Sequence, residues 1–136
     1  MVNKKNLAGI LILVLVFGMM VIGCDDNLIG YTFEFRLSCP NYLTTYGETT
    51  KIEFINGSNK DAPVIKTEMT NISSGEMTSI YKVSGFTEKN EDNKCIYGIK
   101  LTWRDEVSFK YASAIDMSKI LITLTTSSMS FSSGSW

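Results

Sequence analysis

The sequence predicts an all-β protein, either an antiparallel sandwich or a small barrel of about seven or eight strands. Three observations lead to this prediction. Apolar and polar residues alternate with period two in one segment after another. Clusters of Asn, Gly, Ser and Asp separate these segments at turn spacing. After the first 24 residues, no segment carries an apolar stripe of helical spacing over three turns.

The clearest strand is predicted at 31–37, where aromatic and aliphatic residues alternate with Thr, Glu and Arg. The same alternation predicts further strands at 51–55, 63–69, 77–83, 95–103, 106–111 and 119–125. Met129 and Phe131, two residues apart in a Ser-rich tail, predict a last edge strand. A flexible end at 127–136 is the alternative.

The strongest predicted pair is a hairpin of 95–103 with 106–111, because the two segments match in alternation and only Arg104 and Asp105 link them. We expect large residues on the inner faces to form the core. They are Phe33, Phe35, Tyr97, Leu101, Trp103 and Phe109. Their polar neighbours Glu34, Lys100 and Lys110 are expected to face solvent.

The start of the chain has the pattern of an export signal. Lys4 and Lys5 precede an uncharged run at 7–23, which is short for a membrane span. This signal helix is either cleaved or membrane-inserted. We therefore expect a signal peptide at 1–23, a short polar tether at 24–30 and a single β domain at 31–136.

Val21, Ile22, Gly23 and Cys24 end this run. The junction resembles the lipobox of bacterial lipoproteins, in which the cysteine thiol is acylated and the peptide is cut just before it. The resemblance implies that Cys24 is the lipidated N-terminus and that the three residues before it are recognised during processing. It also implies a bacterial cell envelope location, membrane-anchored by lipid, with the membrane and leaflet left open. Several acyl chains suffice for stable anchoring, since each buried methylene contributes about 0.8 kcal/mol.

The mature part is also similar to small spirochaetal lipoproteins, in its Tyr-Thr-Phe-Glu-Phe opening at 31–35 and its Ser- and Gly-rich aromatic end. This similarity implies no particular activity.

Two cysteines remain in the mature part, Cys39 and Cys95. An even pair in an exported domain predicts a disulfide between them. Two unpaired buried thiols are the alternative.

The composition excludes several kinds of chemistry. Without histidine, the chain cannot form a Ser-His-Asp or Cys-His catalytic set or a His-ligated zinc site. Because 13 basic residues balance 14 acidic ones, nucleic acid is not an expected partner. The S-x-x-K string from Ser79 to Lys82 lies in a strand, where its ends face opposite ways, and the acidic segment 88–93 lacks the glycine of a calcium loop. We expect no enzyme activity, cofactor or metal.

Aromatic residues in loops are the remaining candidates for function. Tyr42, Tyr46 and Trp136 are of the types that anchor protein interfaces or stack on sugars, although such residues also cap the ends of sandwiches. The sequence thus favours a lipid-anchored extracytoplasmic binding or envelope-interaction module, with an envelope protein or a glycan as partner. An inhibitor of an envelope-degrading enzyme and a purely structural envelope lipoprotein are the alternatives. The oligomeric state is left open.

Overall fold

Alternating segments of the chain form strands, and each lies within two residues of its expected ends. The computed structural model describes residues 30–40, 48–72, 75–113 and 116–134. Its strands are β1 (Tyr31–Cys39), β2 (Thr49–Asn56), β3 (Val64–Asn71), β4 (Gly75–Val83), β5 (Ile96–Trp103), β6 (Glu106–Ser113), β7 (Lys119–Leu124) and β8 (Met129–Ser133). The all-β prediction is confirmed, and β8 is the edge strand expected in the tail.

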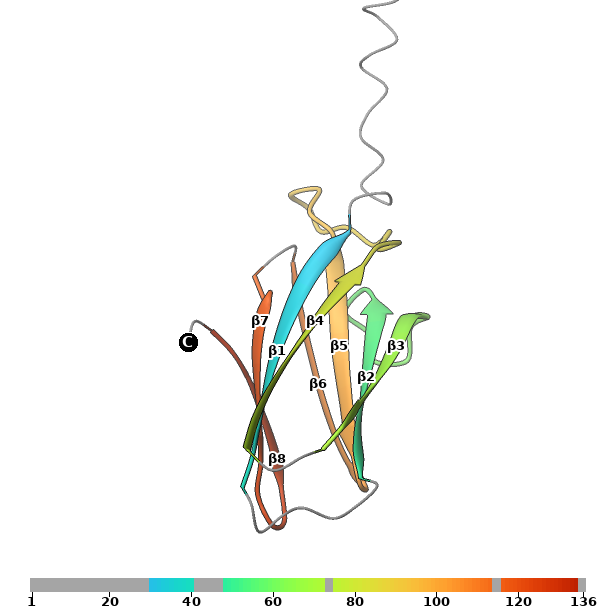
Figure 1. Ribbon diagram of the computed structural model, residues 1–136. Coiled ribbons are helices and arrows are strands. Elements are labelled where there is room, and N and C mark those ends of the chain that lie inside the picture. The colour runs from blue at the N-terminus through green and yellow to red at the C-terminus, as the bar shows by residue number, and fades with distance from the viewer. Residues whose placement is uncertain (1–29, 41–47, 73–74, 114–115, 135–136) are drawn as a thin grey trace, which may run out of the picture.

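The eight strands form two four-stranded sheets that pack as a sandwich rather than closing into a barrel (Figure 1). One sheet has the order β4-β1-β7-β8 and the other has the order β3-β2-β5-β6. The hairpins β2–β3, β5–β6 and β7–β8 join sequence neighbours. The expected antiparallel arrangement holds for every pair except β1–β7, which is parallel. Local alternation carries no information on strand direction, so this parallel pair could not be predicted from it.

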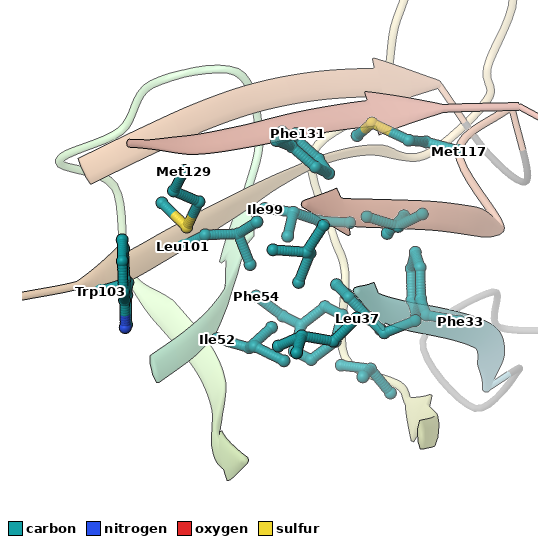
Figure 2. Packing of buried hydrophobic residues seen from close by; sticks show 14 of the residues in the cluster. Phe33, Leu37, Ile52, Phe54, Ile99, Leu101, Trp103, Met117, Met129 and Phe131 are labelled. Atoms are coloured by element: carbon teal, nitrogen blue, oxygen red, sulfur yellow. The ribbon is translucent and has the colours of Figure 1, made fainter. Parts of the chain in front are cut away.

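The inner faces of the two sheets form one apolar core (Figure 2). Phe33 of β1 packs across the two sheets, and its ring centroid lies 4.9 Å from that of Phe54 on β2 and 5.1 Å from that of Tyr97 on β5. Five of the six predicted core residues are at most 2% exposed, namely Phe33, Phe35, Tyr97, Leu101 and Trp103.

The sixth, Phe109, was assigned to the wrong face. The tight turn at Arg104-Asp105 sets Trp103 opposite Glu106, and this register sets Phe109 opposite Lys100. Directly paired residues share a face, so Phe109 lies with Lys100 on the outer face of the sheet.

Lys110 lies on the opposite face of β6 from Phe109. It pairs with Ile99 and so lies on the core side of β6, where we expected Phe109. Its ammonium avoids the core by reaching the other sheet, where Nζ donates to the carbonyl oxygen of Phe131 at 2.8 Å and lies 5.0 Å from the ring centroid of Phe131. Lys110 therefore joins two edge strands and is still exposed to solvent, as expected.

Candidate functional site

Several of the predicted site residues lie outside the described residues. These are Cys24 with its recognition residues Val21, Ile22 and Gly23, and the aromatic residues Tyr42, Tyr46 and Trp136. The described ranges contain no helix that is long and apolar enough to cross a membrane. The described candidates for a site lie on the two sheets and their connecting loops.

The predicted disulfide is absent, because Cys39 and Cys95 are free, buried thiols. Cys95 lies near the start of β1, since its Sγ is 3.8 Å from the carbonyl oxygen of Phe86 and the ring of Phe86 is 5.8 Å from that of Tyr31. Cys39 is the last residue of β1, so it lies about 25 Å away at the opposite end of the sandwich. A disulfide needs Cα atoms within about 7 Å.

Neither thiol has the features of a reactive cysteine. Burial raises the pKa of the Cys39 thiol, and the nearby carboxylate of Glu48 raises it further. A thiol that stays protonated is a poor nucleophile. Cys39 and Cys95, at 1% and 2% exposed, are core residues at opposite ends of the sandwich.

The two enzyme-like strings have structural explanations. On β4 the half-buried Ser79 and the exposed Lys82 lie on opposite faces, as expected, so they form no nucleophile and base pair. In the acidic loop, Oδ1 of Asn90 accepts a hydrogen bond from the N–H of Lys94 at 2.9 Å and closes a tight turn. No group of three potential metal ligands occurs among the residues that the structure describes.

At the Arg104-Asp105 turn, the carboxylate of Glu48 forms an ion pair with the guanidinium of Arg104. Glu48 accepts hydrogen bonds from Nε1 of Trp103 at 3.2 Å and Nε of Arg104 at 3.1 Å. The guanidinium of Arg104 lies 4.3 Å from the ring centroid of Trp103, and its backbone has φ of 54°. These contacts hold Arg104 in a conformation that non-glycine residues rarely adopt. Because Trp103 is only 2% exposed beneath it, this cluster of side chains stabilises a turn and offers no exposed ring to a ligand.

The outer face of the β3-β2-β5-β6 sheet, here called the apolar face, is the most unusual surface of the described residues. The strand registers arrange its side chains in three rows across the sheet. They run Met69–Lys51–Thr102–Val107, Thr67–Glu53–Lys100–Phe109 and Val64–Ile55–Gly98–Tyr111. Apolar side chains therefore lie on the edge strands β3 and β6 of this face, on either side of a charged centre.

The charges at the centre of the apolar face are paired. Glu53, at 8% exposed, has one carboxylate oxygen 2.7 Å from Nζ of Lys51 and the other 4.0 Å from Nζ of Lys100. Four apolar residues around this cluster are strongly exposed: Val64 at 47%, Met69 at 58%, Val107 at 54% and Tyr111 at 62%.

Phe109 is fixed on the apolar face by a glycine. A Cβ atom built on Gly98 would lie 2.6 Å from the Phe109 ring, so the ring occupies the space of the missing side chain. Beside Gly98 lies Ile55, which is completely buried yet does not belong to the main core. The face thus has a small packed centre of its own.

Sequence reasoning missed the apolar face because it placed the apolar residues of 106–111 in the core. A signal was nevertheless present. With two residues in the turn, an odd-numbered residue of β5 must pair with an even-numbered residue of β6, so 107, 109 and 111 cannot face the core with Trp103.

The chain shows no significant match to any protein family, curated protein or solved structure.

Proposed function

We propose that this protein is a lipid-anchored, non-catalytic binding module of the bacterial cell envelope, and that the apolar face is its binding surface. The observation that supports this surface most is the exposure of Val64, Met69, Val107 and Tyr111 on one side of one sheet. They form two apolar edges of the same face, on β3 and on β6, and exposed apolar residues concentrated on one face are typical of interaction sites, whereas scattered ones are ordinary.

The proposed partner is a protein. Aromatic residues and methionine are enriched at the centre of protein interfaces, where unpaired charges are rare. The apolar face carries these residue types, with Tyr111, Phe109 and Met69 on its edge strands, and the carboxylate of Glu53 between them is ion-paired. A glycan site would instead need flat exposed rings with polar groups beside them.

The test of the surface compares two variants of the full chain. Val64→Ser/Met69→Ser replaces the two exposed apolar side chains on the β3 side of the apolar face. Ile80→Ser is the control, because it replaces one apolar side chain, 64% exposed, on β4 of the other sheet. Partners are isolated from the envelope with the wild-type protein, and their affinity for each variant is then measured. We expect a loss of about thirtyfold or more for the double variant and little change for Ile80→Ser. Equal affinities for wild type and the double variant would contradict the assignment, and binding on a glycan array instead would contradict a protein partner.

The lipid anchor has a separate test. A Cys24→Ala chain should lose radiolabelled palmitate and leave the detergent phase in Triton X-114 partitioning. A variant that still carries the label and partitions like wild type would show that the lipobox interpretation is wrong.

A further inference from the structure

The sandwich has four edge strands, and β8 is protected against pairing with another strand. Its N–H at Met129 donates to a carboxylate oxygen of Glu106 at 2.6 Å, and its carbonyl at Phe131 accepts from Lys110 at 2.8 Å. Both side chains come from β6 of the other sheet. They occupy backbone groups that a further strand would need.

On the other side of the sandwich, β3 and β4 are protected as well. Pro63 immediately precedes β3, and the register of β3 against β2 shifts at Ile55. Nζ of Lys66 reaches across from β3 to the carbonyl oxygen of Lys82 on β4 at 3.2 Å. Proline, irregular register and charged side chains are common ways of blocking an edge.

The fourth edge strand, β6, lacks these features. Its eight residues keep an unbroken register with β5 and contain no proline. Its exposed edge carries the apolar residues Val107, Phe109 and Tyr111 on the outer face, while the charged groups of Glu106 and Lys110 are directed to β8.

The backbone of β6 offers free hydrogen-bonding groups at these three positions. Gly57 N–H donates to the carbonyl oxygen of Ile96, so even-numbered residues of β5 direct their backbone groups towards β2. Odd-numbered residues of β5 therefore bond to even-numbered residues of β6, as a two-residue hairpin requires. The N–H and C=O groups of Val107, Phe109 and Tyr111 point away from β5, and within the described ranges no other backbone group bonds to them.

We propose that β6 pairs with β6 of a second copy of this chain, antiparallel and across a two-fold axis at Phe109. In this register Phe109 lies opposite Phe109 of the second copy, and Val107 lies opposite Tyr111 of the second copy. All six free backbone groups then find partners. The two four-stranded sheets become one eight-stranded sheet, and the apolar faces of both copies become continuous.

Three features favour a second copy as the occupant. The side chains that meet on the outer face are apolar on both strands, and such cross-strand pairs are stabilising. On the inner side Ser108 meets Lys110 of the second copy, whose ammonium is already engaged by Phe131 of its own chain, so like charges do not meet. The pairing also stops at a dimer, because it uses the β6 edges of both copies. The protected strand β3 then lies at each end of the joined sheet.

The edge of β6 borders an open depression of the surface. A depression of about 470 Å³ lies along this edge and is lined by Phe109, Lys110 and Tyr111 of β6 together with Asp116 and Ser133.

The register is tested by disulfide trapping of the full chain in cells. Val107→Cys and Tyr111→Cys chains are expressed separately and together, oxidised, and resolved on a non-reducing gel. We expect a disulfide-linked dimer only when the two variants are present together. In a dimer of a single variant, the introduced cysteine lies about 13 Å from the same cysteine of the second copy, which is too far for a disulfide bond. Wild type controls for all three native cysteines, Cys24 and the buried Cys39 and Cys95. Dimers of equal yield in all three samples, or in none, would overturn the proposal.

Sedimentation of the purified full chain in detergent measures the dimer without added cysteines. Val107→Lys places a charge on the β6 edge, and Ile80→Lys makes the matched change at an exposed residue of β4. Val107→Lys should reduce the dimer at least about tenfold, and Ile80→Lys should leave it unchanged. A monomeric wild-type chain would overturn the proposal. So would a dimer that Val107→Lys leaves intact. Neither result bears on partner binding through Val64 and Met69, which lie on β3 at the opposite edge of the sheet.

Discussion

The two outer faces of the sandwich have the same alternating backbone and very different chemistry. On the β4-β1-β7-β8 sheet the outer face carries Thr, Ser and charged residues, including the ion pair of Arg36 with Glu76. Its one strongly exposed large apolar residue among those described is Ile80. The apolar face of the other sheet has four, and it holds Phe109 and Ile55 in addition.

This difference separates the requirements of folding from those of function. Both sheets bury aromatic and aliphatic residues on their inner faces, which suffices to hold the sandwich together. A polar outer face is the ordinary solution for an antiparallel sheet in water. The apolar face departs from this pattern and does not contribute to the main core, which is why we propose it as the interaction surface.

The largest expected effect is a difference in unfolding free energy between variants on the inner and outer sides of the β5–β6 hairpin. Leu101 is completely buried on the inner side, whereas Val107 on the outer side is 54% exposed. Leu101→Ala should lower the free energy of unfolding by about 2 to 5 kcal/mol. Val107→Ala should change it by about 0.5 kcal/mol or less. Chemical denaturation measures both, and similar losses would show that the faces are wrongly assigned.

A pH titration should give the next largest effect. Burial raises the pKa of the Tyr97 phenol to about 12 from 10.0, and the Asp116 carboxylate adds to the rise, whereas a hydrogen bond from the N–H of Met117 acts against it. Between these pH values the folded state keeps a proton that the unfolded chain releases, so stability is complete below pH 10 and falls as pH rises. The loss is about 2 to 3 kcal/mol.

Tyr97→Phe is the control for this titration, because it removes the phenol and leaves every other titrating group in place. The difference in unfolding free energy between wild type and Tyr97→Phe should shrink between pH 10 and pH 12. A difference that stays constant over this range would refute the burial of the Tyr97 hydroxyl.

A smaller effect is expected from Gly98→Ala. The added methyl group would meet the Phe109 ring at 2.6 Å, so the ring must leave its place on the apolar face. We expect a loss of about 1 to 3 kcal/mol. Gly134→Ala is the control, since its Cβ would meet nothing within 4 Å. Equal stability of the two variants would mean that Phe109 does not pack on Gly98.

The smallest effect on stability is expected from the double variant that we expect to weaken partner binding most. Val64→Ser/Met69→Ser removes two exposed side chains and should change the free energy of unfolding by about 1 kcal/mol or less, since surface changes cost about 0.5 kcal/mol each. Thermal or chemical unfolding beside the affinity measurement separates the two quantities. If the double variant loses binding only because it is unfolded, the result would not support the apolar face as the binding surface.

Most of the fold could be predicted from the sequence, because period-two alternation is a local property. It placed Phe33, Phe35 and Leu101 on inner faces, and the structure confirms these positions. The parallel β1–β7 pair and the separation of Cys39 from Cys95 depend on how distant segments meet. Alternation within one segment holds no information about that.

The candidate site was harder to predict than the fold. Aromatic residues in loops drew the prediction to Tyr42, Tyr46 and Trp136, which lie outside the described residues. Hydrophobicity alone predicts that apolar residues of β6 belong to the core, because alternating apolar strand residues usually face inward. A register, rather than a hydrophobicity pattern, was needed to place Phe109 and Tyr111 on the outer face.

The most direct test of the apolar face is site-specific photo-crosslinking of the full chain in intact cells. A photoreactive residue replaces Met69 on the apolar face in one sample and Ile80 on the other sheet in a second, at positions 58% and 64% exposed. The two positions are similarly open to solvent, so unspecific capture should be similar. We expect a discrete adduct with a partner protein from position 69 and none from position 80. The same adducts from both positions, or an adduct from position 80 alone, would contradict it.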